Sequence, residues 1–396
     1  MVRLSRFNSR VPSGSWLVLL ACLCCWPALL GAATAPSPKP VIVAYVFPQN
    51  ALIHPGDIAA GKVTRINYAF ANIADGRIVN GFQNDDQNMA ALVALKKDNP
   101  SLTVLVSVGG WLWSGAFSDM AYTEVSRRTF ISSVADFVTR NHLDGVDVDW
   151  EYPGLPGSQP RFRVQDRENY TLLLEDLRAS FDKLEKKLKR NLYLTVATGA
   201  QAEFLAHTEM DKVQQYVDTV NLMAYDYYEP DSDAITGHHA PLYTNPADPR
   251  KVSADDSVAL YEQAGVQPEK IVLGVPFYAH VWGQVPAANH GLYQPGKKVD
   301  HARELYGASP DAMLQNGFQR YWDPVADVPW LYNSEKQVFV SYDDPESLKS
   351  KCKYVLDHKL GGVMFWDYES DASGALLDAV DGGLRGGASA ARHIDK

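Results

Sequence analysis

Three carboxylates alternate along one short segment of the chain, LDGVDVDWEYP at residues 143–153. On a β-strand successive side chains point to opposite faces, so Asp147, Asp149 and Glu151 share one face. Burial and like charge both raise carboxyl pKa values, so the set is expected to retain a proton. A glycosidase needs such a proton for its leaving oxygen, and Glu151, the last of the three, is the candidate acid.

Two other interpretations of the same segment are a solvated acidic strand and a metal-binding cluster. A solvated face fits poorly with the barrel fold that is predicted below, because this strand face would point into the interior of the barrel. A metal site usually brings His or further oxygen ligands, and the segment contains no His. No metal ligand and no cofactor are therefore expected.

Apolar runs rich in β-branched residues alternate with amphipathic segments along the chain, which is typical of buried parallel strands joined by helices. Helices are expected at 124–140, 171–190 and 345–359, where apolar residues recur on one face. The pattern predicts an α/β fold, a (β/α)₈ TIM barrel, with a doubly wound sheet as the alternative; a barrel places catalytic groups at the C-terminal ends of its strands. The predicted strands are 41–47, 65–71, 103–108, 145–150, 193–197, 219–224, 271–276 and 362–365.

One stretch, between the seventh predicted strand and the helix after it, departs from the alternation of strands and helices. Residues 283–341 are long for a barrel loop and rich in Gly and Pro. We expect a small α+β insertion there that walls one side of the cleft; an ordinary long loop is the alternative. The predicted domain limits are 34–40 for a linker, 41–385 for the barrel and 386–396 for a C-terminal tail.

The acidic segment resembles the signature of glycoside hydrolase family 18, the chitinases and their relatives, which reads Asp-x-x-Asp-x-Asp-x-Glu. Here it falls at Asp144, Asp147, Asp149 and Glu151. The resemblance continues along the mature chain in segments similar to the family's third, sixth, seventh and eighth strands. These segments are SVGGW at 107–111, MAYD at 223–226, GVPFY at 274–278 and GGVMFW at 361–366.

The resemblance implies a role for each catalytic candidate. Glu151 would protonate the glycosidic oxygen, and the acetamido carbonyl of the substrate would attack the anomeric carbon to give an oxazolinium intermediate with retention of configuration. Asp149 would bind the acetamido N–H, and Asp147 would share a proton with Asp149. Tyr225 would bind the acetamido carbonyl, and Asp226 would contact polar groups of the sugar.

Aromatic side chains at strand ends fit the same resemblance, because sugar rings pack their C–H faces on aromatic planes. Trp366 would form the floor of the cleft, while Trp113 and Trp282 are interpreted first as core residues. One departure from the family follows Tyr278, where Ala279 and His280 replace the usual Gly-Arg. His280 is either a structural residue or one that alters binding or pH dependence. The expected substrate-binding residues are Tyr45, Phe70, Trp111, Tyr152, Met223, Asp226, Tyr278 and Trp366.

The N-terminus reads as an export signal over residues 1–33. Three arginines precede an apolar run at 16–30, and small residues follow it. The run is shorter than the roughly 20 residues of a membrane span, so a secreted or periplasmic protein, free of the membrane after cleavage, is expected. A lipoprotein signal at Cys22 is the alternative. Cys352 is then the single cysteine of the mature chain and is expected to be a buried thiol.

Charge and composition limit the partners. Of the 37 Lys and Arg residues, three lie in the signal, so the mature chain has 34 basic and 47 acidic residues and a net charge of −13. This argues against nucleic acid as a partner and is compatible with an uncharged polysaccharide. The expected protein is a monomeric chitinase acting on chitin or chito-oligosaccharides. The alternatives are an endo-β-N-acetylglucosaminidase acting on glycans or peptidoglycan, and a non-catalytic chitin-binding lectin.

Overall fold

In a computed structural model, the described part of the chain comprises residues 39–306 and 309–390. The expected signal segment, Cys22 and most of the expected linker lie outside these ranges, as do residues 391–396. Within the described ranges, no helix is both long and apolar enough to cross a membrane.

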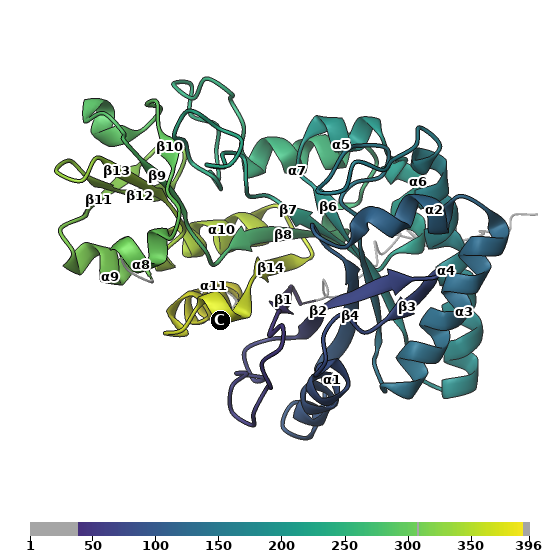
Figure 1. Cartoon of the computed structure of the whole chain (residues 1–396). Helices are drawn as coiled ribbons and strands as arrows, with labels where there is room; N and C mark the ends of the chain where they lie inside the picture. The colour runs from purple at the N-terminus through teal and green to yellow at the C-terminus, as the bar shows by residue number, and fades with distance from the viewer. Residues whose placement is uncertain (1–38, 307–308, 391–396) are drawn as a thin grey trace, which may run out of the picture. The chain divides into compact units, whose positions relative to one another are not determined.

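The described residues contain a closed barrel of eight parallel strands (Figure 1). The strands are β1 (Val41–Val46), β2 (Arg65–Ala74), β4 (Thr103–Gly109), β5 (Gly145–Asp149), β6 (Tyr193–Gly199), β7 (Thr219–Met223), β8 (Ile271–Pro276) and β14 (Gly362–Trp366). Strand β1 pairs with both β2 and β14, which completes the ring; Val43 lies opposite Arg65, and Val41 opposite Gly362. The predicted (β/α)₈ fold is confirmed, and the doubly wound alternative is wrong.

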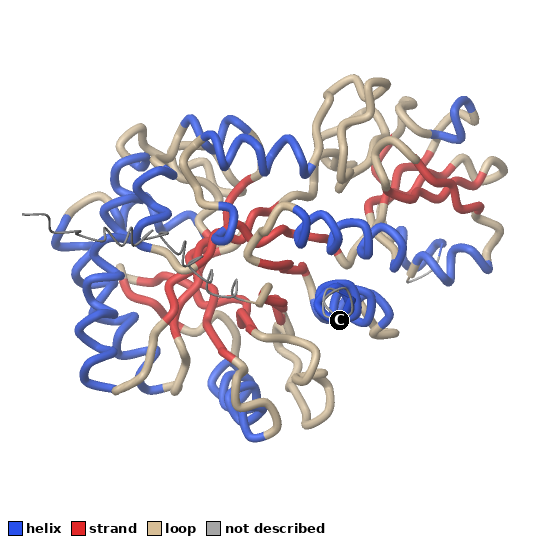
Figure 2. The backbone as a smooth tube through the Cα atoms, turned by 180° about the vertical axis from the view of Figure 1, so that it is seen from behind, coloured by secondary structure: helices blue, strands red, loops and turns tan. Residues whose placement is uncertain are grey.

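Helices surround the strands, as Figure 2 shows in blue around red. Helix α3 has the predicted bounds, and its capping box at Thr123 and Ser126 explains where it begins. Helix α10 begins at Pro345, where Asp344 caps the free N–H groups. The helices are α1 (Asp85–Ala94), α2 (Phe117–Ala121), α3 (Glu124–Arg140), α4 (Asp166–Leu188), α5 (Ala202–Ala206), α6 (Met210–Tyr216), α7 (Ala254–Gln263), α10 (Pro345–Asp357) and α11 (Ala375–Ala390).

The insertion between β8 and α10 forms a second, antiparallel sheet in the order β10-β9-β13-β12-β11. In Figure 1 it lies at the left, in green, on the side away from α3 and α4. The sheet begins at His280, three residues before the predicted start, because Val281 and Trp282 are buried and β9 pairs with β13. Its elements are β9 (His280–Gly283), β10 (Lys297–Lys298), α8 (Ala302–Tyr306), α9 (Pro310–Gln315), β11 (Gln319–Asp323), β12 (Val328–Asn333) and β13 (Val338–Ser341).

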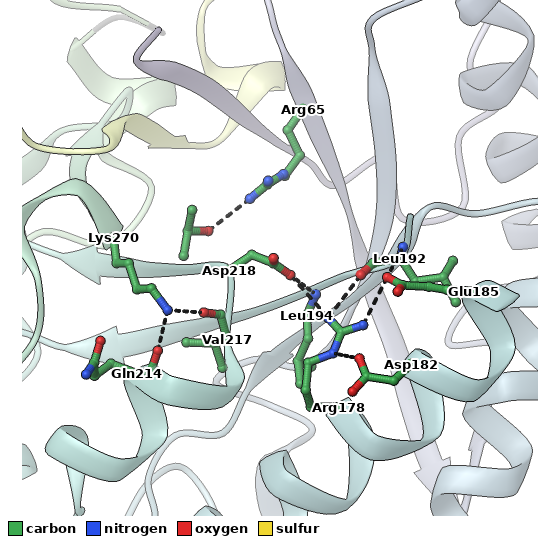
Figure 3. A network of polar contacts seen from close by, with 11 residues as sticks. Arg65, Arg178, Asp182, Glu185, Leu192, Leu194, Gln214, Val217, Asp218 and Lys270 are labelled. Carbon is green, nitrogen blue, oxygen red and sulfur yellow. Dashed lines mark hydrogen bonds and ion pairs between the residues drawn. The ribbon is translucent and has the colours of Figure 1, made fainter. Parts of the chain in front are cut away.

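Polar contacts tie helix α4 to the N-terminal ends of the barrel strands (Figure 3). Arg178 donates to the carbonyl of Leu192 at 3.1 Å and to Glu185 at 3.0 Å. Its guanidinium also lies 3.6 Å from Asp218, which accepts from the N–H of Leu194 at 2.7 Å. In barrels this end serves stability while the opposite end carries the chemistry. The strand ends opposite this network are therefore where the site is expected.

The C-terminal helix packs on the barrel helix before it. Helix α11 continues to Ala390, past Arg385, after which a tail was expected. A Cβ on Gly383 would lie 2.7 Å from the Cβ of Cys352, so only glycine lets α11 approach α10 this closely. Cys352 is 1% exposed, as predicted for a core thiol, and burial raises its pKa to about 12.

Candidate active site

Strand β5 carries the acidic residues toward the inside of the barrel. Asp147 and Asp149 are buried, and Glu151, two residues beyond the strand, is partly exposed. Trp150, on the opposite face, stacks on Phe117 outside the strands, with ring centroids 5.2 Å apart. The alternation predicted from the sequence therefore places the carboxyl groups within the barrel and the apolar side chains against its helices.

Asp147 lies at the centre of a hydrogen-bonded layer. Its Oδ2 accepts from the hydroxyls of Tyr45 at 2.8 Å and Ser107 at 2.7 Å. Its Oδ1 accepts from Thr195 at 2.5 Å and from the amide of Asn221 at 3.1 Å. Burial raises the pKa of Asp147, and the hydroxyl donors partly offset this by stabilising the carboxylate. Donors from four different strands thus hold this carboxyl in one orientation.

Asp149 is buried at the level above and lacks such donors. Among the described residues its Oδ1 has no hydrogen-bond partner. Burial, and then the charges of Glu151 and Asp147, raise its pKa well above the usual value. The described contacts include no hydrogen bond between Asp147 and Asp149, so the proton expected to be shared by them stays a prediction. A buried, unpartnered carboxyl oxygen beside a cavity is available to a ligand.

Glu151 is an acid whose pKa lies near neutrality. Burial raises its pKa to about 7; a hydrogen bond with Tyr152 works against this, and the charges of Asp226 and Glu229 add to it. Its backbone N–H donates to Ser114 at 2.9 Å, which fixes the chain just beyond β5. A carboxyl group that is about half protonated near pH 7 can both donate and accept a proton.

A cavity of about 680 Å³ opens over the C-terminal ends of the strands. Every predicted site residue except Asp147, which lies behind it, lines this cavity. Trp366 stacks on Phe70 with ring centroids 5.4 Å apart, and Phe47 packs on the same indole at 5.5 Å. These rings form an apolar surface on which a sugar ring could lie. The predicted residues lining the cavity are Tyr45, Phe70, Trp111, Asp149, Glu151, Tyr152, Met223, Tyr225, Asp226, Tyr278 and Trp366.

Asp226, three residues beyond β7, has a left-handed backbone conformation (φ +58°). Its Oδ1 accepts from the hydroxyl of Tyr278 at 2.5 Å and lies 2.7 Å from Nε2 of His280. Burial alone would raise its pKa, but His239 and His280 hold that pKa well below its usual value. His280, the departure from the family pattern, therefore holds the carboxyl that lies beside Tyr225 in the chain.

The sequence did not single out several residues of the site. Glu229 lines the cavity, and burial, followed by the charge of Asp226, raises its pKa to about 7. His239 is wholly buried behind Asp226. Both lie in the long connection after β7, which has no periodic pattern. Trp113, interpreted first as a core residue, instead lines the cavity, whereas Trp282 is wholly buried as expected.

Acidic groups at the C-terminal ends of the strands, beside a cavity with an aromatic floor, define the class: a (β/α)₈-barrel protein of the glycoside hydrolase type. Comparison with known families agrees. The sequence model of Glycosyl hydrolases family 18 matches residues 41–371. The chain belongs to this family.

Individual relatives bear different names. The chain is 35% identical to Chitinase A1 of Niallia circulans over 391 residues, which covers 83% of this chain and 56% of that one. A solved family 18 N-acetylglucosaminidase from Paenibacillus barengoltzii is 40% identical, with a TM-score of 0.78, and the match covers 87% of this chain and all of that one. Chitinase ChiA74 from Bacillus thuringiensis is 31% identical with a TM-score of 0.81, covering 88% of this chain and 70% of that one.

Proposed function

We propose that this protein hydrolyses β-1,4-linked N-acetylglucosamine polymers, chitin and chito-oligosaccharides, with retention of configuration. Family membership and the chitinases among the relatives support this reaction class. The observation that carries it is the pair of acids in one cavity. Asp149 has an unpartnered buried oxygen, and Glu151, whose pKa burial raises to about 7, lines the same cavity as the indole of Trp366.

The proposed mechanism uses the substrate as its own nucleophile. Glu151 gives its proton to the glycosidic oxygen as the bond to the anomeric carbon breaks. The acetamido carbonyl oxygen bonds to that carbon, while the free oxygen of Asp149 accepts the acetamido N–H and Tyr225 donates to the carbonyl side. Water then attacks the anomeric carbon, and Glu151 accepts a proton from this water. The bond between the acetamido oxygen and the anomeric carbon breaks, which restores the acetamido group of the sugar. The departing and entering groups use the same face, so configuration is retained.

Replacement of the acid tests this mechanism. Glu151→Gln keeps the shape but cannot donate the proton, so turnover of a chito-oligosaccharide should fall by roughly 10²-fold or more with an unchanged melting temperature. A fully de-N-acetylated oligomer of the same length should resist the wild-type protein, because it lacks the nucleophile. Wild-type turnover in the variant, or equal cleavage of both oligomers, would disprove the mechanism. A lectin would bind the oligomer without cleaving it.

A second candidate, removal of single terminal N-acetylglucosamine units, is favoured by one observation. The whole length of the Paenibacillus barengoltzii N-acetylglucosaminidase matches this chain, and the match covers 87% of this chain. Oligomers of defined length, labelled at the reducing end, separate the two. A chitinase should release disaccharides or internal fragments first, and an N-acetylglucosaminidase the monosaccharide alone. An enzyme acting on glycoprotein glycans would leave the oligomers intact and release glycan instead.

We also propose that the protein works outside the cytoplasm as a monomer, after removal of residues 1–33. The basic, then apolar, then small-residue order at the N-terminus supports export. Amino-terminal sequencing of the mature protein should give a start near residue 34. A start at Cys22 carrying a lipid would support the lipoprotein alternative instead. Light scattering on the purified protein tests the monomer.

A further inference from the structure

Three side chains that can bind a metal ion meet at one corner of the cavity. Asp226 follows β7, His239 lies in the long connection after it, and His280 begins β9 of the insertion. One ligand atom from each lies within 4.8 Å of the other two. The carboxylate oxygen of Asp226 is 2.7 Å from Nε2 of His280 and 3.6 Å from Nδ1 of His239. The three residues are far apart in sequence, so the fold brings them together.

His239 has a buried polar side chain that lacks hydrogen-bond partners. The residue is 0% exposed, and neither ring nitrogen has a hydrogen-bond partner among the described residues. Its Nδ1 lies 3.6 Å from the carboxylate of Asp226, close enough to act on the charge of that group but too far for a hydrogen bond. Its backbone N–H is satisfied by Ser341 at 2.8 Å, so the main chain is fixed while the ring nitrogens are not. Buried polar nitrogens without hydrogen-bond partners are energetically costly and rare. A metal ion that is coordinated by one of the ring nitrogens would supply the missing partner.

The charges around this corner favour a cation. Asp226, Glu229 and Glu151 line the same cavity, and the charge of Asp226 raises the pKa values of the other two. The buried ammonium group of Lys351 is paired with Asp343 at 2.5 Å and so adds no uncompensated positive charge. A divalent ion among these acids would relieve their mutual repulsion.

We propose that Asp226, His239 and His280 form a binding site for one first-row transition metal ion, with Zn²⁺ as the representative. Two imidazoles and a carboxylate suit Zn²⁺, Cu²⁺ or Ni²⁺ better than Mg²⁺ or Ca²⁺. Metal–ligand bonds of about 2.0–2.2 Å place tetrahedral ligand atoms roughly 3.3 Å apart. The Asp226 oxygen lies 2.7 Å from the nitrogen of His280 and 3.6 Å from that of His239, on either side of this value. Small side-chain movements would therefore bring the three ligand atoms to tetrahedral spacing.

A bound ion would change the cleft in a defined way. The oxygen of Asp226 that now contacts Tyr278 and His280 would be taken up by the metal. Because Asp226 lines the cavity, the ion and its water ligands would occupy space next to Tyr225. The metal is therefore inhibitory, and it competes with substrate. Only this consequence rests on the proposed function; the binding itself does not.

Calorimetric titration of the full chain, without a polyhistidine tag, with Zn²⁺ tests the binding directly. We expect one equivalent to bind at this site, because the three ligand atoms lie within 4.8 Å of one another. Mg²⁺ should give no heat. Cys22, Cys24 and Cys25 could hold zinc elsewhere in the chain, so the decisive comparison is between variants that all keep them.

His280→Arg is the sharpest variant. An arginine still donates to Asp226 but has no lone pair for a metal, so this one zinc equivalent should be lost or its Kd raised roughly tenfold or more. His239→Asn should do the same from the buried side. His54→Asn, at an exposed histidine that does not line the cavity, should bind zinc like the wild type. Circular dichroism confirms that each variant is folded.

Inhibition is the second readout. Zn²⁺ should raise the apparent KM for a chito-oligosaccharide, and a chelator should reverse the effect. In His280→Arg the zinc sensitivity should disappear. If folded His280→Arg and His239→Asn both bind as many zinc ions as the wild type, the proposed site is wrong. If zinc binds there but no substrate is turned over, the metal site stands and the proposed function fails.

Discussion

Glu151, the proposed acid, and Glu229 line the same cavity, and the pKa values of both are raised. Burial is the largest cause for both, and each pKa is raised to about 7. The charge of Asp226 raises both pKa values. The pKa of Asp226 itself is held well below its usual value, so this carboxyl group stays ionised. The proton on Glu151 therefore depends on the charge of neighbouring residues as well as on its own burial.

Glu229→Gln should shift the pH dependence of turnover. In the proposed mechanism Glu151 must be protonated, so turnover should fall as pH rises through the pKa of Glu151. Glu229 becomes negative over the same range and raises that pKa, so its removal should move the alkaline limb to lower pH, by about a few tenths of a unit. Turnover measured from pH 5 to pH 9 checks this. Glu203→Gln, on exposed α5, is the control; a shift to higher pH would contradict the prediction.

At the residue scale, the sequence predicted the groups that a linear motif can carry. Asp147, Asp149 and Glu151 were found because strand alternation places them on one face. Thr195 and Asn221, which hold Asp147, lie on two other strands, and nothing in their own segments marks them. His239 was missed for the same reason, since its importance comes from the residues that the fold brings to it.

Strands were easier to predict than connections. Strand β8 is buried along its whole length, so its sequence is continuously apolar and has a clear signal. Helix α4 begins at Asp166, five residues earlier than predicted, because that turn is anchored by polar contacts. Asp166 accepts from Ser118 at 2.9 Å and from the N–H of Arg163 at 2.7 Å. The periodicity of apolar residues cannot predict a helix start that is set by polar contacts.

The close approach of β4 to the end of β5 depends on Gly109. Its φ is +109°, and a Cβ there would lie 2.1 Å from the carbonyl oxygen of Asp149. Gly109→Ala should therefore push the two strand ends apart, lower the free energy of unfolding by about 2–4 kcal/mol and reduce turnover by displacing Asp149. Urea unfolding and activity measure both effects.

The matched control is Gly61→Ala, where a Cβ meets nothing within 4 Å. It should change the free energy of unfolding by less than about 0.5 kcal/mol. An equal loss in both variants would contradict the role of the contact with Asp149, because the lower entropy of the unfolded chain that alanine brings is expected to stabilise the folded state at both positions.

At the scale of the whole described unit, the insertion and the long connection after β7 depend on each other. The carbonyl of Ala326 accepts from the N–H of Leu242 at 2.9 Å, and Ser341 accepts from the N–H of His239. The insertion thus contributes His280 to the cleft and also fixes the connection that carries His239 and Glu229. Its boundary could be approximated from the sequence, but this second role required the structure.

Asp323, at the end of β11, is the residue through which the two segments are fastened. Its Oδ2 accepts from the amide of Asn245 at 2.7 Å and lies 3.2 Å from Nε2 of His238. Its Oδ1 accepts from the N–H groups of Val325 and Ala326. Burial alone would raise the pKa of Asp323, but these partners hold it well below the usual value. The ionised form is thus the stabilising one.

Asp323→Asn should lower the free energy of unfolding by about 1–3 kcal/mol at pH 7, because the amide replaces an acceptor with a donor that faces Asn245. A carboxyl group whose pKa is depressed on folding stabilises above its unfolded pKa, and this contribution is lost as pH falls. The difference between wild type and variant should therefore be constant from pH 7 to pH 5 and shrink below about pH 4. Urea unfolding across this range measures it, with Asp98→Asn at an exposed site as the control. A difference that grows on acidification would show that the carboxylate does not fasten the insertion to the barrel.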